Sequence, residues 1–188
     1  MKETEITLQI FNSLEETTKI LKEQGFKETK NFIMDDHYFT SLTDVKNKPY
    51  SEIIKNSILL RNFSTSNQHV LIYKNKEFDS AGNVVCEEKI NCEVENIYFV
   101  KKILKLANFN NFVNLNTHIQ VFNRENVGFA IQDVKNLGLF IEIEEFEYMK
   151  NMSPEQKAQE LLKVANSLNL KLGTDYNCKK VQMMLDKQ

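Results

Sequence analysis

Charged residues occupy the polar positions of several segments in which polar and apolar side chains alternate. Glu3 and Glu5 lie in the first of these segments, and Glu142 and Glu144 lie in the run FIEIE of the last long one. Basic residues hold the same kind of position in the middle of the chain, at Arg61, Lys74 and Lys76. Because successive side chains of a strand point to opposite faces, each set would share one face of its strand. The chemistry that such a face offers is the attraction of ions, charged ligands or water.

This pattern has two explanations, which the alternation by itself leaves open. The first is the solvated outer face of an antiparallel sheet, which usually carries polar residues. The second is a closed barrel with a polar interior, whose apolar outer face is covered by helices. Charges inside a protein are costly unless they pair or bind ions. The second explanation therefore implies a charged ligand.

Strands are the elements that would position these charges. In the first strand Thr4, Ile6, Leu8 and Ile10 alternate with the polar positions. Period-two alternation predicts further strands over 36–41, 57–63, 69–78, 84–95, 117–123, 128–132 and 139–146. Residues 81–83, Ala-Gly-Asn, are typical of a tight hairpin connection.

Three segments carry the signals of helices. Ser13 is an N-cap candidate and Gly25 a stop signal for the first helix. Asn96 is expected to cap a second helix, with five apolar residues facing inward: Ile97, Val100, Ile103, Leu104 and Ala107. Ser153 and Pro154 are a cap and a favoured first residue for the third. About eight antiparallel strands and three helices predict an α+β fold.

Length and composition limit the class of protein. The 188 residues suit a single domain over 1–188. A formal charge of −2 gives no reason to expect nucleic acid or an anionic membrane as a partner. The three cysteines have no metal-ligand spacing, and no stretch resembles a signal peptide or a membrane span. We therefore expect a cytoplasmic protein with free thiols and no membrane partner.

The order of the elements and four short motifs resemble the CYTH, or triphosphate tunnel, superfamily, which includes class IV adenylyl cyclases, thiamine triphosphatases and inorganic triphosphatases. Residues 134–144, VKNLGLFIEIE, are similar to that family's D-x-V-x-x-L-G-x-F-x-E-I-E signature. Residues 3–7 stand at its N-terminal E-x-E-x-K, residues 36–39 at its D-x-Y-F strand, and residues 73–74 at its Y-K pair. The match covers nearly the whole chain in order and spacing.

The resemblance implies an eight-stranded antiparallel closed barrel, the triphosphate tunnel, with about three helices outside it. In the family, acidic residues hold Mg²⁺ or Mn²⁺ and inward cations hold the triphosphate of a small molecule such as ATP. The implied metal ligands are Glu3, Glu5, Glu142 and Glu144. The implied phosphate contacts are Arg61 and Lys74, with partial compensation for lost cations from Lys76, Lys89 and a protonated His118. The oligomeric state stays open, a homodimer being one alternative.

The chain departs from the family pattern at four charged positions. Uncharged residues stand there: Thr7, Leu59, Gln120 and Gln132. Each lost charge-assisted contact is worth roughly 1.5–3 kcal/mol in a sheltered site. The departures thus leave the fold expectation intact and weaken the expectation of enzyme activity.

Two functions stay open at this point. The first is a divergent metal-dependent enzyme that acts on an organic triphosphate, as an adenylyl cyclase or as a triphosphatase. The alternative is a non-catalytic relative that binds a less charged phosphate ligand or a protein partner. The retained glutamates favour the first function, and the lost cations favour a changed ligand.

Overall fold

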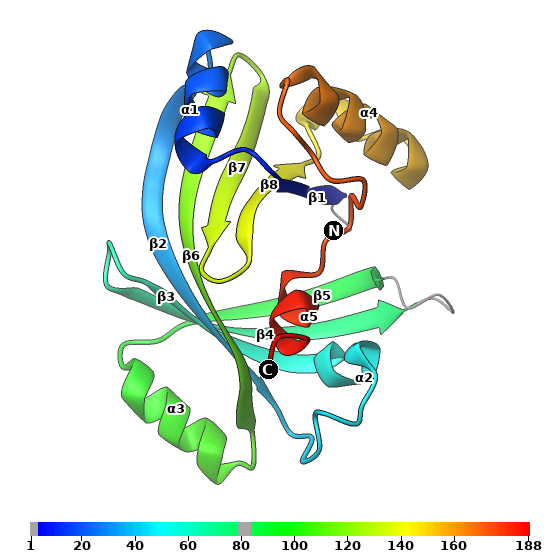
Figure 1. Ribbon diagram of the computed structural model, residues 1–188. Helices are drawn as coiled ribbons and strands as arrows, with labels where there is room; N and C mark the ends of the chain where they lie inside the picture. The colour runs from blue at the N-terminus through cyan, green and yellow to red at the C-terminus, as the bar shows by residue number, and fades with distance from the viewer. Residues whose placement is uncertain (1–3, 79–83) are drawn as a thin grey trace. The chain divides into compact units, whose positions relative to one another are not determined.

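The chain folds around one eight-stranded sheet in a computed structural model that describes residues 4–78 and 84–188 (Figure 1). The strands are β1 (Glu5–Ile10), β2 (Lys27–Thr40), β3 (Asn56–Phe63), β4 (Gln68–Phe78), β5 (Val84–Glu93), β6 (Asn110–Arg124), β7 (Val127–Val134) and β8 (Gly138–Glu144). Their order in the sheet is β1-β8-β7-β6-β2-β3-β4-β5. The predicted hairpin connection at 81–83 and the predicted ligand Glu3 lie outside the described residues.

The helices are α1 (Leu14–Glu23), α2 (Tyr50–Ile54), α3 (Ile97–Leu106), α4 (Pro154–Ser167) and α5 (Lys180–Leu185), with a 3-10 turn over Glu147–Met149. The α+β class and the antiparallel pairing are confirmed. Two short helices, α2 and α5, add to the three predicted ones. Among the described residues, no helix is long and apolar enough to span a membrane.

The sheet is not closed into a barrel, so that part of the prediction is wrong. Within residues 4–78 and 84–188, β1 pairs with β8 and β5 with β4 at the two ends of the strand order. Residues 171–178, which we call the C-terminal strap, occupy the other edge of β1. The Thr7 amide donates to the Tyr176 carbonyl over 3.0 Å, and the Gly173 amide donates to the Gln9 carbonyl over 2.8 Å. The strap satisfies the backbone groups with which a further strand would have paired.

Contacts divide the chain into two units. The first contains residues 3–32 and 117–180, and the second contains residues 33–116 and 181–188. In the first unit, apolar residues of β1, β6, β7 and β8 form a core with α1 and α4, through side chains such as Leu8, Phe122, Ile141, Leu21 and Leu161. In the second unit, Phe39 and Leu60 pack against Leu104 of α3. In both units the helices therefore cover the apolar face of the strands.

Local sequence signals explain the helix ends. The Ser13 hydroxyl accepts a hydrogen bond from the Glu16 amide over 3.1 Å, and Gly25 takes a left-handed φ of 84° after α1. Asn96 accepts from the Phe99 amide over 3.1 Å, and Ser153 forms a complete capping box with Gln156. These predicted caps are confirmed.

The inward face predicted for α3 is only partly confirmed. Leu104 is buried, and Ile97 and Val100 are half-buried. Ile103 is instead 63% exposed, and Ala107 lies at the exposed end of the helix.

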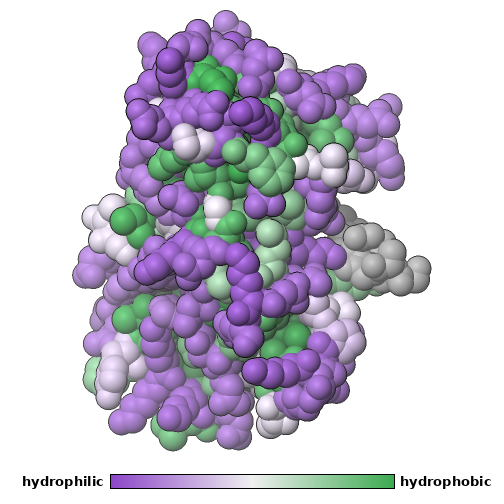
Figure 2. Space-filling model, in the orientation of Figure 1, coloured by the Kyte–Doolittle hydropathy of each residue, from purple (hydrophilic) through white to green (hydrophobic). Residues whose placement is uncertain are grey.

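In the view of Figure 2 hydrophilic residues cover most of the visible face, with apolar residues in smaller patches.

A sheltered ion pair fastens α4 to the start of β1 and the end of β8. Lys157 donates to Glu145 over 2.8 Å, and the two side chains are 10% and 16% exposed. Glu145 also accepts a hydrogen bond from the Thr4 amide over 2.9 Å. The hydrogen bond from Lys157, followed by the one from Thr4, lowers the pKa of Glu145 below its usual value. This pair holds together the two strand ends that carry Glu5 and Glu144.

Replacing Lys157 with Met is expected to lower the free energy of unfolding at pH 7 by about 1.5–3 kcal/mol, the range for a hydrogen bond to a charged group. A carboxylate whose pKa is lowered by folding stabilises the protein above its unfolded pKa, about 4.3, and loses that contribution as the pH falls through the folded pKa. Urea unfolding at pH 7 and at about pH 3 should therefore show a smaller difference between variant and wild type in acid. Lys163→Met, which removes an exposed pair with Glu160 on the same helix, is the matched control and should change stability by under about 0.5 kcal/mol. Equal stability of Lys157→Met and wild type at pH 7 would contradict this account.

Candidate functional site

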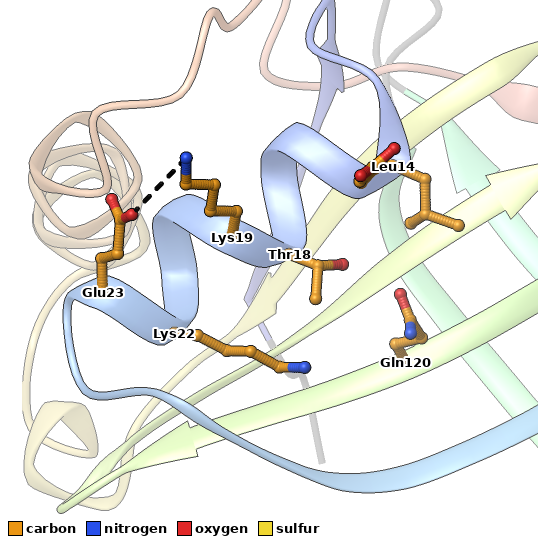
Figure 3. Close-up of a pocket in the computed structure, with 7 residues that line it drawn as sticks. Leu14, Thr18, Lys19, Lys22, Glu23 and Gln120 are labelled. Atoms are coloured by element: carbon orange, nitrogen blue, oxygen red, sulfur yellow. Dashed lines mark ion pairs between the residues drawn. The ribbon is translucent and has the colours of Figure 1, made fainter.

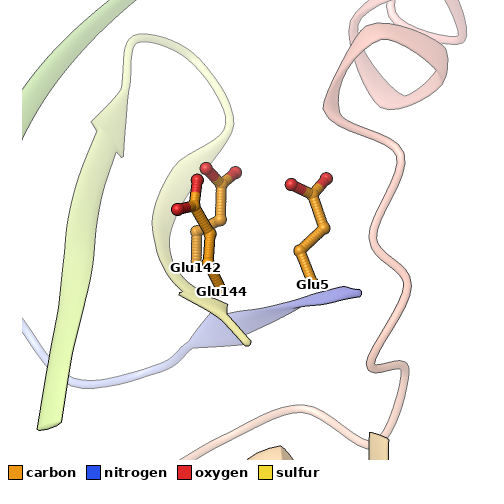
Figure 4. A group of neighbouring side chains, drawn as sticks. All are labelled: Glu5, Glu142 and Glu144. Carbon is orange, nitrogen blue, oxygen red and sulfur yellow. The ribbon is translucent and has the colours of Figure 1, made fainter. Parts of the chain in front are cut away.

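Three of the predicted metal ligands meet on one face of β1 and β8. Glu5 and Glu144 are register partners, and Glu142 lies two residues away along β8, opposite Thr7. One carboxylate oxygen from each glutamate lies within 4.8 Å of the others. Figure 4 shows the three side chains rising on the same side of the two strands. Glu5 and Glu144 are exposed, and Glu142 is half-buried.

The chemistry of this donor set fits a hard divalent cation. Mg²⁺ and Mn²⁺ prefer carboxylate oxygens, and Mg²⁺ usually takes one or two of them and keeps several waters. Three carboxylates this close also repel one another unless a cation lies among them. Glu5, Glu142 and Glu144 would be the residues that hold such an ion.

Sequence reasoning missed a lysine that contacts this glutamate group. Lys180 donates to Glu142 over 2.8 Å and also to the side-chain oxygen of Gln132. Gln132 lies on β7, is 5% exposed, and occupies the position of the family signature's leading Asp. Lys180 belongs to no motif and follows the C-terminal strap, so nothing in its local sequence points to this contact.

In the second unit, the predicted cations share one face of β3, β4 and β5. Ser57 of β3 is the register partner of Lys74, which in turn pairs with Lys89 of β5. Lys76 lies two residues beyond Lys74 on β4, and therefore on the same face. Register places Arg61 on this face as well, whereas the opposite face packs against α3. The register therefore places Arg61, Lys74, Lys76 and Lys89 on one face of these three strands.

Arg61 is engaged by a neighbouring carboxylate. Its guanidinium donates two hydrogen bonds of 2.8 Å to Asp36 of β2, the register partner of Arg61. The Asp36 side chain is 4% exposed and that of Arg61 is 27% exposed. Part of the positive charge of Arg61 therefore balances a buried negative charge.

A buried hydroxyl on the same face has no hydrogen-bond partner among the described residues. Ser57 is 1% exposed, and its Oγ makes no hydrogen bond. Buried polar groups are nearly always satisfied by protein, water or ligand. A polar partner beside Lys74 is therefore expected, which is compatible with a phosphate oxygen or with water.

His118 and Gln120 do not join the glutamates. Gln120 pairs with Ile131 and Phe122 with Phe129, on the face that α1 covers, whereas Ile119 pairs with Gln132 on the glutamate face. A shift of one residue along a strand changes the face. His118 instead contacts the Asn31 side chain at 2.7 Å.

Gln120 lines a separate pocket of about 650 Å³ between α1 and β6. Figure 3 shows it facing α1, with Thr18 and Lys22 on the side of the helix nearer to it. The Gln120 side chain donates to Glu28 over 3.3 Å, and its oxygen is buried without a hydrogen-bond partner in the described part of the chain. Of the other uncharged replacements, Thr7 and Gln132 lie on the glutamate face, and Leu59 lies on the face of Arg61.

Known proteins resemble this chain in sequence and in fold. No family model matches the chain. It is 23% identical over 171 residues to a curated protein of Methanocaldococcus jannaschii that is named as a candidate adenylate cyclase, with 90% of this chain and 91% of the relative covered.

Solved structures share the fold. A candidate adenylate cyclase of Vibrio parahaemolyticus matches with a TM-score of 0.68 and 13% identity, over 98% of this chain and 97% of the other. A candidate adenylyl cyclase of Hippeastrum, described as having a dominant triphosphatase activity, matches with a TM-score of 0.62 and 13% identity, over 99% and 96% of the two chains.

Proposed function

We propose that this chain, a CYTH-like protein, binds an organic triphosphate together with a divalent metal ion and acts on the phosphate chain. The observation that carries the proposal is the group of three carboxylates within 4.8 Å of one another, on the two strands where the family motifs predicted them. The relatives named as cyclases or described with triphosphatase activity support the same class of ligand.

The residues of each unit have separate tasks in this proposal. Glu5, Glu142 and Glu144 would hold Mg²⁺ or Mn²⁺, and the bound ion would supply positive charge and Lewis acidity toward phosphate oxygens. Arg61, Lys74, Lys76 and Lys89 are proposed as contacts to phosphate oxygens, since ammonium and guanidinium groups neutralise a triphosphate through charge-assisted hydrogen bonds. His118 is left out of this set because it lies on the face of β6 opposite to that of the glutamates and its ring contacts the Asn31 side chain.

Two reactions fit a triphosphate bound in this way. A cyclase would direct a ribose hydroxyl to the α-phosphorus and release pyrophosphate, and a phosphohydrolase would direct water to the terminal phosphorus. Both depend on positioning and charge neutralisation rather than on a protein nucleophile. The products therefore distinguish the two reactions.

The test is a titration of the protein with ATP, thiamine triphosphate and tripolyphosphate, each with Mn²⁺, with Mg²⁺ and with neither. We expect binding of at least one of the three only when an ion is present, followed by release of phosphate, or of pyrophosphate with cyclic AMP. Calorimetry reports binding, and separate assays report each product. Absence of ion-dependent binding at about 1 mM ligand, an affinity of only about 4 kcal/mol, would overturn the proposal.

A protein partner is the second candidate function, and one surface favours it. Phe99, Ile103 and Leu106 follow a helical spacing along α3 and are 58%, 63% and 76% exposed. A contiguous exposed apolar stripe is typical of protein contact surfaces. If the titration fails for all three ligands, this face of α3 is the feature to test next.

A further inference from the structure

The C-terminal strap lies along β1 at the level of the glutamate group. Thr7 is bonded on both of its backbone groups by the strap, since its amide donates to Tyr176 over 3.0 Å and its carbonyl accepts from the Cys178 amide over 3.1 Å. On the other side of β1, Thr7 is the register partner of Glu142. The strap is therefore anchored at the one residue of β1 that lies directly across from Glu142.

Lys180 follows this anchor by two residues, and its side chain returns to the glutamate group. It donates to Glu142 over 2.8 Å and to the side-chain oxygen of Gln132. The side chains of Lys180 and Glu142 are only 18% and 24% exposed, so the contact is sheltered from water. Three carboxylates and this ammonium leave a formal charge of −2, which a single divalent ion would balance.

We propose that Lys180 is a phosphate-binding residue that replaces the lysine missing at position 7. Register partners on antiparallel strands have Cβ atoms about 4.5–5.5 Å apart on the same face. A lysine at position 7 would therefore bring its ammonium group to Glu142, which is where the ammonium of Lys180 lies. An ammonium group has three protons to donate. Glu142 and Gln132 accept two of them, and the third is assigned to a phosphate oxygen.

This inference rests on the proposed function, and a competing role for Lys180 gives opposite results. As a phosphate-binding residue, Lys180 increases affinity for the triphosphate. As a tethered cation that merely fills the glutamate group, it competes with the metal ion and lowers that affinity. A neutral substitution separates the two roles.

The experiment measures tripolyphosphate binding by calorimetry at saturating Mn²⁺, and Mn²⁺ binding alone, for four variants. Lys180→Gln is expected to weaken tripolyphosphate binding by at least about tenfold, the effect of one lost charge-assisted contact, without weakening Mn²⁺ binding. Thr7→Lys added to Lys180→Gln should restore the affinity to within about threefold of wild type. Lys180→Arg should keep most of it. Lys171→Gln is the matched control, because Lys171 is an exposed lysine of the strap. It should change the affinity by less than about twofold, because an exposed charge has little effect.

Each of the remaining outcomes contradicts one part of the proposal. If Lys180→Gln binds tripolyphosphate as well as wild type or more tightly, while wild type does bind it, Lys180 does not bind phosphate. If Lys180→Gln loses binding and Thr7→Lys does not restore it, the positional replacement is wrong. If wild type binds no tripolyphosphate with Mn²⁺, the proposed function itself fails. Thermal melting of each variant separates a lost contact from lost folding.

Discussion

Replacing Arg61 with Met is expected to lower the free energy of unfolding by about 3 kcal/mol, because it leaves the carboxylate of Asp36 without its partner. The Asp36 side chain is 4% exposed and accepts two 2.8 Å hydrogen bonds from Arg61. Removing one member of a buried ion pair usually costs about 3–5 kcal/mol, and the partial exposure of Arg61 places this pair at the lower end. Urea unfolding of the ligand-free protein measures the loss.

A double variant tests the cause of this loss. Arg61→Met combined with Asp36→Leu removes both charges, so it should recover most of the stability, because apolar residues often replace a buried ion pair without cost. If Arg61→Met changes stability by less than about 0.5 kcal/mol, which is typical of a surface pair, the guanidinium is not needed by Asp36. Its charge would then be available to a ligand in full.

This ion pair changes the interpretation of Arg61. The resemblance to the CYTH superfamily implies that Arg61 is a phosphate contact. The structure shows that its β2 neighbour Asp36, which was noticed only as part of the D-x-Y-F motif, already holds it. Pairing between distant strands is set by the whole sheet, so a local motif does not contain it.

Local rules predicted those parts of the fold that depend on neighbouring residues. Ser13, Asn96 and Ser153 cap helices because a side-chain oxygen three residues before a backbone amide can satisfy it. Alternation located the strands with one buried face, such as β1 and β8. It missed residues 27–35 of β2 and 110–116 of β6. Residues 27–31 are exposed without alternation, so they carry no period-two signal.

The errors at the candidate site arise because contacts between residues that are far apart in the sequence cannot be seen in local sequence patterns. The C-terminal strap occupies the edge of β1 where a closed barrel would need a strand, and it brings Lys180 to Glu142 across 38 residues of sequence. Register places His118 on the face of β6 opposite to that of the glutamates, and a local sequence pattern does not determine which of the two faces a strand residue takes. The closeness of Glu5, Glu142 and Glu144, by contrast, follows from the pairing of β1 with β8, the strands in the two segments where the sequence shows an E-x-E spacing.

The glutamate group is expected to make thermal stability depend on Mn²⁺, and the double variant Glu5→Gln/Glu144→Gln should abolish that dependence. An ion that binds only the native state stabilises it by about 2.7 kcal/mol when its free concentration is about 100 times Kd. For a chain of this length, that corresponds to a rise of roughly 5–10 °C in Tm. The two residues are register partners, and their replacement leaves the contact between Lys180 and Glu142 in place.

The direction of the change in Tm without Mn²⁺ distinguishes loss of an ion-binding site from simple damage to the fold. Removing two of three close carboxylates relieves repulsion, so the Tm of the double variant without Mn²⁺ should equal or exceed that of wild type. Glu95→Gln/Glu125→Gln, which neutralises two exposed glutamates outside the group, is the control and should keep the full response to Mn²⁺. A Mn²⁺-dependent rise that persists in Glu5→Gln/Glu144→Gln would place the ion elsewhere. A lower Tm without Mn²⁺ would instead mean that the two carboxylates stabilise the strands themselves, and the metal centre would lose its main support.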